Sequence, residues 1–133
     1  FEIDGEVAKP RTLSYSQLLA LPSIEREVLL ICPGFFSIYG RWKGVSVMEL
    51  LKLAKADDNI THISLRGPKS RYEKEEQFPV EDIVSNKVFL AYQVNGQNLP
   101  QKHGFPLRVV AEDYYGSQWV KYVYKMEVHN IPK

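Results

Sequence analysis

The chain has 133 residues, of which 44% are hydrophobic, and this size predicts one globular domain, residues 1–133, with one modest core. The formal net charge is +1, from 17 basic and 16 acidic residues, so overall charge does not favour a nucleic acid or an anionic membrane as a partner. A single cysteine excludes an internal disulfide framework, and no apolar run is long enough to cross a bilayer. The chain begins at Phe1 without a methionine, which predicts that an upstream segment was removed.

Short helices are predicted at two serine caps and at one further site. Ser14 starts the first helix, and Gln17 completes a capping box that satisfies backbone N–H groups. Ser46 starts the second helix with Glu49 in the same relation, and an apolar face follows that would pack on the core. The predicted helices span residues 14–21, 46–54 and 81–84.

Strand-like apolar runs separate these helices. A buried run delivers Cys32 at its end, Pro33-Gly34 turns the chain, and an aromatic loop continues to Trp42. Asn95-Gly96 is predicted to form a hairpin turn because both residues tolerate positive φ, and the charged segment 66–77 is predicted to be a loop. The predicted strands are 1–7, 27–31, 60–65, 88–94, 106–111 and 119–129. Many short strands and few helices predict an α+β fold with a mixed β-sheet.

Short motifs follow one another in order along nearly the whole chain. They are Gly5-Glu6-Val7, Leu13-Ser14-Tyr15, Trp42-Lys43-Gly44-Val45, Leu90-Ala91-Tyr92, Asn95-Gly96, His103-Gly104-Phe105-Pro106-Leu107-Arg108 and Val120-Lys121-Tyr122. This pattern resembles the molybdopterin-binding domain of the sulfite oxidase family, which includes plant-type nitrate reductases and the periplasmic methionine sulfoxide reductase catalytic subunit. The resemblance implies the sulfite-oxidase-like molybdopterin-binding fold and a small prokaryotic member of the family.

The resemblance implies that Cys32 is the metal ligand and a catalytic residue. A thiolate suits molybdenum held in a dithiolene pterin, because the thiolate and the dithiolene are both soft sulfur ligands. Taken alone, a lone cysteine is more often a small buried hydrophobe. Tyr72 lies near the position of an active-site tyrosine in the family, and is the second candidate catalytic residue.

The resemblance also implies a cradle for the cofactor. Arg108 and Lys121 would hold its phosphate, the first through a bidentate guanidinium and the second as a point charge. His103 would hydrogen-bond the pterin, and backbone groups of Trp119 and Val120 would complete the cradle. Taken alone, the histidine, arginine and lysine also suit an ordinary loop or strand surface.

The segment after the cysteine departs from the family pattern. Here Pro33-Gly34-Phe35-Phe36 stands where sulfite oxidases place Gly-Asn-Arg-Arg, whose arginine helps hold an anionic substrate. This departure argues against sulfite as the substrate. The aromatic side chains of Phe35, Phe36, Tyr39 and Trp42 suggest a more apolar mouth, although aromatic loops are more often simply packed.

The sequence thus predicts a molybdenum-pterin-dependent oxidoreductase that transfers an oxygen atom, coupled to two electrons, on a small-molecule substrate. The resemblance implies a separate electron-transfer partner, a membrane-associated one included, because no haem domain is present. It also implies a monomer, a periplasmic or otherwise extracytoplasmic location, and a pterin pocket more open than in larger members, whose upstream residues help to form it.

Two alternatives belong to other classes. A cofactor-free binding module could retain the fold, but the joint presence of Cys32, His103, Arg108 and Lys121 argues against it. A nucleic-acid binder would use the basic residues between 69 and 74, and glutamates lie among them and cancel the patch that a phosphate backbone needs. The basic residues concerned are Lys69, Arg71 and Lys74, and the glutamates are Glu73, Glu75 and Glu76.

Overall fold

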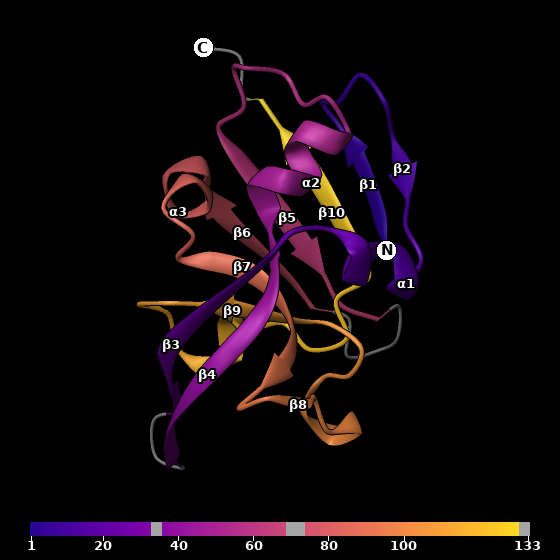
Figure 1. The fold of residues 1–133 in the computed structure, drawn as a ribbon. Coiled ribbons are helices and arrows are strands. Elements are labelled where there is room, and N and C mark those ends of the chain that lie inside the picture. Colours follow the sequence, from indigo (N-terminus) through magenta and orange to yellow (C-terminus); the bar gives the residue numbers. More distant parts are fainter. Residues whose placement is uncertain (33–35, 69–73, 131–133) are drawn as a thin grey trace.

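Two five-stranded sheets form the framework of the protein (Figure 1). The computed structural model describes residues 1–32, 36–68 and 74–130, with the backbone alone at 31, 32, 36–38 and 117. Within these residues the chain also forms three short α-helices and two 3-10 turns. Short strands with few helices confirm the α+β prediction, although the strands build two sheets rather than one.

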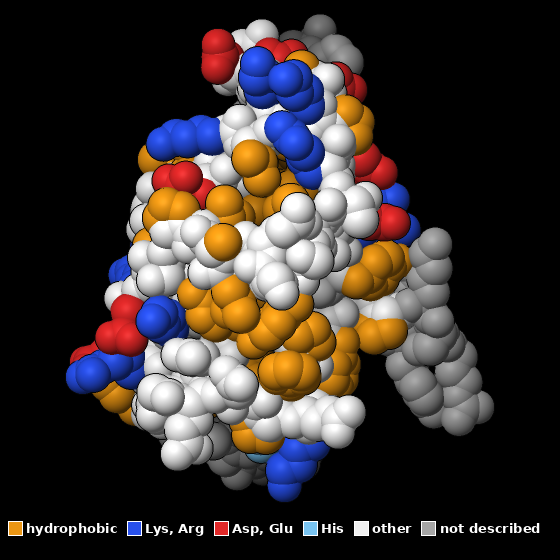
Figure 2. Space-filling view, turned by 45° about the vertical axis from the view of Figure 1, so that its right-hand side comes forward, with side chains coloured by type: hydrophobic (Ala, Val, Ile, Leu, Met, Phe, Trp, Pro, Cys, Tyr) orange, Lys and Arg blue, Asp and Glu red, His pale blue; other side chains and the backbone are white. Residues whose placement is uncertain are grey.

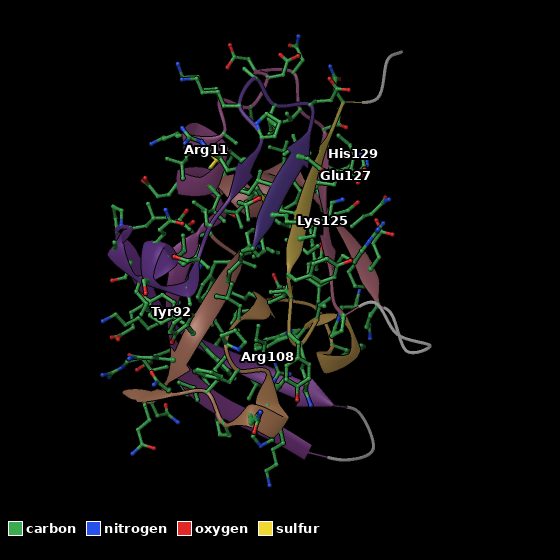
Figure 3. The ribbon with its side chains drawn as sticks, turned by 90° about the vertical axis from the view of Figure 1, so that its right-hand side faces the viewer. Arg11, Tyr92, Arg108, Lys125, Glu127 and His129 are labelled. Atoms are coloured by element: carbon green, nitrogen blue, oxygen red, sulfur yellow. The ribbon has the colours of Figure 1, made fainter. Side chains whose placement is uncertain are left out.

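The first sheet has the strand order β2-β1-β10-β5-β6. Its β1 and β10 are parallel and its other pairs are antiparallel, so the sheet is mixed, as predicted. In Figure 3 the side chains of Lys125, Glu127 and His129 line up along β10. The strands are β1 (Glu2–Gly5), β2 (Arg11–Thr12), β5 (His62–Arg66), β6 (Glu75–Pro79) and β10 (Lys125–His129).

The second sheet is antiparallel throughout and has the order β3-β4-β7-β8, with β9 also paired to β7. A long β3–β4 hairpin forms one edge of this sheet and extends away from the first sheet (Figure 1). Asn95 and Gly96, both at positive φ, make the predicted turn between β7 and β8. The strands are β3 (Ser23–Cys32), β4 (Phe36–Ser46), β7 (Val88–Val94), β8 (Gln97–Asn98) and β9 (Arg108–Ala111).

The helices begin where the serine caps predict, but one cap differs. Ser14 and Gln17 form the predicted capping box at α1. At α2 the Ser46 hydroxyl accepts from the Met48 N–H and donates to the Asn86 amide oxygen, so the predicted box with Glu49 is wrong. The helices are α1 (Tyr15–Ala20), α2 (Val47–Leu53) and α3 (Val80–Val84).

Three segments differ from the sequence-based expectation. The aromatic loop before Trp42 is part of the strand β4, because its backbone pairs with β3, and from Trp42 onward β4 also pairs with β7. The charged loop 66–77 gives way to β6 at its end, where Glu75 pairs with Arg66. The predicted strand 119–129 is extended only from Lys125, because the chain turns through Tyr122 at φ +56°.

Hydrophobic residues of both sheets and of the helices form one core. Phe78 of β6 and Phe89 of β7 are fully buried, and α2 and α3 both pack against β7. On the face that carries α1, hydrophobic side chains gather at the centre of the surface (Figure 2). No helix within the described part of the chain is both long and apolar enough to cross a membrane.

Candidate cofactor-binding site

The fold places Arg108 and Lys121 opposite one another. They form an isolated antiparallel bridge between β9 and the segment that follows the second 3-10 turn, η2 (Gly116–Gln118). The bridge is closed by backbone hydrogen bonds from Val109 N to Val120 O, at 2.9 Å, and from Val123 N to Leu107 O, at 3.2 Å. Directly opposite residues of an antiparallel pair present their side chains on the same face. The two predicted phosphate ligands, thirteen positions apart, therefore share one face.

The first 3-10 turn, η1 (Gln101–His103), is fastened to this bridge by its carbonyl groups. Each of its three residues accepts one side-chain hydrogen bond: His103 O from Arg108 Nη1 at 3.1 Å, Lys102 O from Lys121 Nζ at 3.3 Å and Gln101 O from Tyr122 Oη at 2.6 Å. These bonds fix the position of the turn relative to the bridge. The side chains of Lys102 and His103 are left exposed beside the two cations.

Gly104 allows η1 to lie this close to β9. It ends the turn in the left-handed region, at φ +117°, which glycine adopts without strain. A Cβ at this position would lie 3.0 Å from the Arg108 Cβ. The glycine in the His-Gly-Phe-Pro motif therefore has a packing role against the arginine stem.

The guanidinium of Arg108 lies against a pair of indole rings that contact each other, and the residue is only 4% exposed. Its Cζ is 5.8 Å from the ring centroid of Trp42 and 5.7 Å from that of Trp119. The two rings meet edge to face, with centroids 5.4 Å apart. The positive charge is therefore held on aromatic surfaces, which attract cations. Figure 3 shows Arg108 in the lower half of the molecule and His129 in the upper half.

Three positive charges lie near His103. Partial desolvation lowers the pKa of its imidazole below the ordinary value, although the side chain is largely exposed, and the positive charges of Lys121, Lys102 and Arg108 lower it further. The imidazole is consequently neutral at pH 7 and can still donate or accept a hydrogen bond. This donor set, two lysines, an arginine and a histidine, suits an anion such as a phosphate group.

The other predicted site residues that the structure describes are not part of this cluster of charged side chains. Trp119 and Val120 are both buried, and the Trp119 N–H and the Val120 carbonyl already hydrogen-bond within the chain, so any contact with a ligand falls to their other backbone groups. Cys32 is the last residue of β3 and pairs through its backbone with Phe36. Tyr72 lies outside the described residues, as does Phe35.

Contrary to what the sequence suggested, Trp42 does not line an apolar mouth. It is 4% exposed and packs inward against Arg108, while Tyr39 on the same strand is 62% exposed. The sequence also missed Lys102, although its position next to His103 was a usable signal. Across the ranges 1–32, 36–68 and 74–130, no three His, Cys, Asp or Glu residues are arranged to hold a metal ion.

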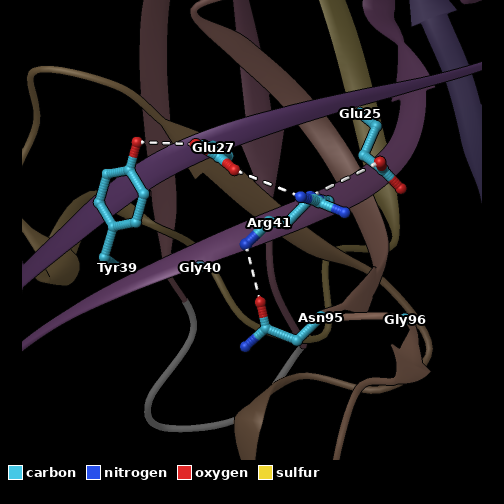
Figure 4. Close-up of a pocket in the computed structure, with 7 residues that line it drawn as sticks. All are labelled: Glu25, Glu27, Tyr39, Gly40, Arg41, Asn95 and Gly96. Carbon is cyan, nitrogen blue, oxygen red and sulfur yellow. Dashed lines mark hydrogen bonds and ion pairs between the residues drawn. The ribbon is translucent and has the colours of Figure 1, made fainter.

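A separate cavity of about 350 Å³ lies on the outer face of the β3–β4 hairpin (Figure 4). Arg41 pairs there with Glu25 at 3.9 Å and with Glu27 at 3.5 Å. The Tyr39 hydroxyl donates to Glu27 at 3.1 Å, and the Arg41 N–H donates to the Asn95 amide oxygen at 2.9 Å. Its charged groups are thus paired with each other, and none of the predicted metal or cofactor ligands lines it, although Tyr39 of the predicted mouth does.

Comparison with known proteins defines the class. Residues 1–133 match the family model of the oxidoreductase molybdopterin binding domain, and the chain belongs to this family. This confirms the family resemblance and makes the chain the molybdopterin-binding domain of an oxidoreductase. The fold is similar to that of the sulfane dehydrogenase SoxCD from Paracoccus pantotrophus, with a TM-score of 0.88 and 23% identity over 98% of this chain and 38% of that one.

Two curated relatives show how much of a larger protein the chain covers. It is 29% identical to the protein-methionine-sulfoxide reductase catalytic subunit MsrP of Gluconobacter oxydans, over 96% of this chain and 46% of the relative. It is 27% identical to the NADH nitrate reductase of Volvox carteri, over 98% of this chain and 18% of the relative. The chain thus spans less than half the length of these two relatives.

Proposed function

We propose that the chain binds molybdenum-molybdopterin with the cofactor's phosphate at His103, Arg108 and Lys121 and with the metal on Cys32. One observation carries the proposal: Arg108 and Lys121 lie opposite each other in a backbone bridge, and both donate to carbonyls of η1, which carries Lys102 and His103. Three cations around one neutral histidine are costly unless an anion compensates them. The molybdopterin cofactor of this family carries such an anion, a phosphate monoester.

Each residue of the cluster has a distinct part in this proposal. Arg108 supplies a buried, fixed positive charge, and Lys121 supplies a flexible one at the surface. His103 donates or accepts a hydrogen bond to the pterin, and backbone groups of Trp119 and Val120 add to the cradle. Cys32, at the end of β3, provides the thiolate ligand. When bound, the cofactor supplies the two-electron redox chemistry, and the protein supplies binding and orientation.

The proposed activity is oxygen-atom transfer on a small-molecule substrate other than sulfite. It draws on the Pro33-Gly34-Phe35-Phe36 sequence after Cys32 and on relatives named for methionine sulfoxide and nitrate reduction. Tyr72 is proposed as a catalytic residue on the resemblance alone. We further propose that residues 1–133 act as one monomeric, extracytoplasmic domain that exchanges electrons with a separate protein.

The test is the molybdenum content of the chain purified from a host that makes the cofactor. The wild type is expected to hold about one molybdenum per chain and to absorb visible light through charge transfer from sulfur to the metal. Cys32→Ser should keep the metal, which the pterin dithiolene holds, and should change the charge-transfer absorption, because a hydroxyl is a poor ligand for this soft site. An unchanged spectrum in metal-loaded Cys32→Ser would refute the ligand assignment. A colourless, metal-free wild type would refute cofactor binding and favour the cofactor-free module.

A further inference from the structure

The attraction of an anion does not by itself explain why the Arg108 side chain is buried. An arginine that only had to attract an anion could stand in solvent, as Lys121 does, yet Arg108 is 4% exposed. Its guanidinium lies against both rings of the Trp42–Trp119 pair, with Cζ 5.8 Å from the first ring centroid and 5.7 Å from the second. The same group donates to the carbonyl of His103.

Each indole ring is itself fixed by a hydrogen bond to the backbone. Trp42 Nε1 donates to the Val28 carbonyl of β3 at 3.1 Å, and Trp119 Nε1 donates to the Tyr114 carbonyl at 3.2 Å. Gly40 makes room for the first ring, since a Cβ there would lie 3.2 Å from Trp42 Nε1. Because neither ring can turn without losing its bond, the backbone sets the plane that each ring presents to the arginine, through β3 for Trp42 and through the segment after β9 for Trp119.

We propose that Trp42 and Trp119 are positioning residues that hold the Arg108 guanidinium in one orientation for an anion at His103 and Lys121. This inference rests on the proposed function for the identity of the anion, but not for the contacts. A long, flexible side chain loses conformational freedom when it binds a ligand, and prior immobilisation reduces that loss. Contact with aromatic rings suits arginine in particular, because its guanidinium is planar and weakly hydrated.

The position of Trp42 on β4 gives this arrangement a second consequence. Its N–H contacts β3 four residues before Cys32, and its ring contacts the arginine on β9. One side chain therefore connects the strand that ends at the proposed metal ligand with the proposed phosphate ligand.

The experiment measures the binding of inorganic phosphate to the full chain by calorimetry, with the chain prepared from a host that cannot make the cofactor. Trp42→Leu, which removes the aromatic face, is expected to weaken phosphate binding by about tenfold, the size of one cation–π contact. Trp42→Phe keeps a ring over the guanidinium and should stay within about twofold of the wild type. Tyr39→Leu, on the exposed face of the same strand, is the matched control and should bind as the wild type does.

A double-mutant cycle separates positioning from a general loss of structure. If Trp42 acts through Arg108, then adding Trp42→Leu to Arg108→Gln should weaken phosphate binding no further. Equal weakening in both backgrounds would overturn the proposal, as would unchanged binding in Trp42→Leu. Trp119→Leu repeats the cycle independently should Trp42→Leu not fold.

The failure of this inference can be told apart from the failure of the proposed function. The chain has only two tryptophans, and both contact Arg108, so phosphate binding at this place should change the intrinsic fluorescence of the wild type. No change in fluorescence, or no phosphate binding, would overturn the positioning role even if the chain holds molybdenum. A chain without molybdenum that shows the coupled phosphate effect would retain this inference and reject the cofactor.

Discussion

Arg108 and Lys121 face each other across an antiparallel bridge, so two positive charges stand side by side on one face of the fold. Like charges directly opposite one another destabilise a pair of strands. The arrangement is thus an energetic cost in the absence of an anion and an advantage in its presence.

Inorganic phosphate should therefore stabilise the protein against unfolding. At about 100 times its dissociation constant, a ligand that binds only the folded state adds ~2.7 kcal/mol. Lys121→Gln should lose most of this gain and should be no less stable than the wild type without phosphate, because it removes one of the two like charges. Thermal unfolding with and without phosphate measures both effects. An equal gain in the two proteins would contradict the placement of the anion beside Lys121.

Anion binding should take up a proton at His103. Burial and three cations lower the pKa of this imidazole, and a bound anion raises it again by neutralising their charge. Affinity for sulfate, an anion that does not titrate in this range, should increase as the pH falls through and below 6.5, the ordinary value for histidine. Calorimetry in buffers of different ionisation enthalpy measures the uptake directly. His103→Gln is the control and should bind sulfate without the proton.

Tyr114 should contribute to stability through its bond to α3. Its hydroxyl donates to the Asp82 carboxylate at 2.5 Å, and burial followed by this bond raises its pKa to about 12. Tyr114→Phe should cost about 1–2 kcal/mol of unfolding free energy, since the bond is charge-assisted and only partly buried. Chemical denaturation measures this, with Tyr115→Phe, at an exposed neighbour, as the control.

The same tyrosine predicts an alkaline effect. A hydroxyl whose pKa is raised in the folded state stabilises fully below the unfolded value of 10.0, and this stabilisation is lost as the pH rises from there to about 12. The wild type should lose more stability than Tyr114→Phe between these values. Parallel losses in the two proteins would show that the hydroxyl does not stay protonated in the folded state.

His62 should make the first sheet sensitive to acid. Its ring stacks on that of His129 across β5 and β10, with centroids 4.6 Å apart, and burial followed by the His129 charge lowers its pKa. For a base with a lowered pKa, the stabilisation is present above the unfolded value of 6.5 and is lost as the pH falls below it. Urea unfolding at pH 7.5 and 5.5 tests this, and His62→Gln should narrow the difference. A difference of the same size in the variant would assign the acid sensitivity to other groups.

Local features were predictable where neighbouring residues decide them. The capping box at Ser14 and the turn at Asn95-Gly96 both depend on interactions within a few residues. Strand β4 was missed because one of its pairing partners, β7, lies far along the chain, and glycines at 40 and 44 weaken its local signal. The box at Ser46 failed for a similar reason, since Asn86, forty positions away, bonds to the same hydroxyl.

The sequence by itself determined the family and the chemical types of the proposed ligands, because the order and spacing of short motifs are written in the chain. Only the tertiary structure decided that Arg108 contacts both Trp42 and Trp119, and that the carbonyls of η1 bond to residues 121 and 122. Trp42 and Arg108 are sixty-six positions apart in the sequence. Contacts at that separation follow from sheet pairing and burial, which no local pattern specifies.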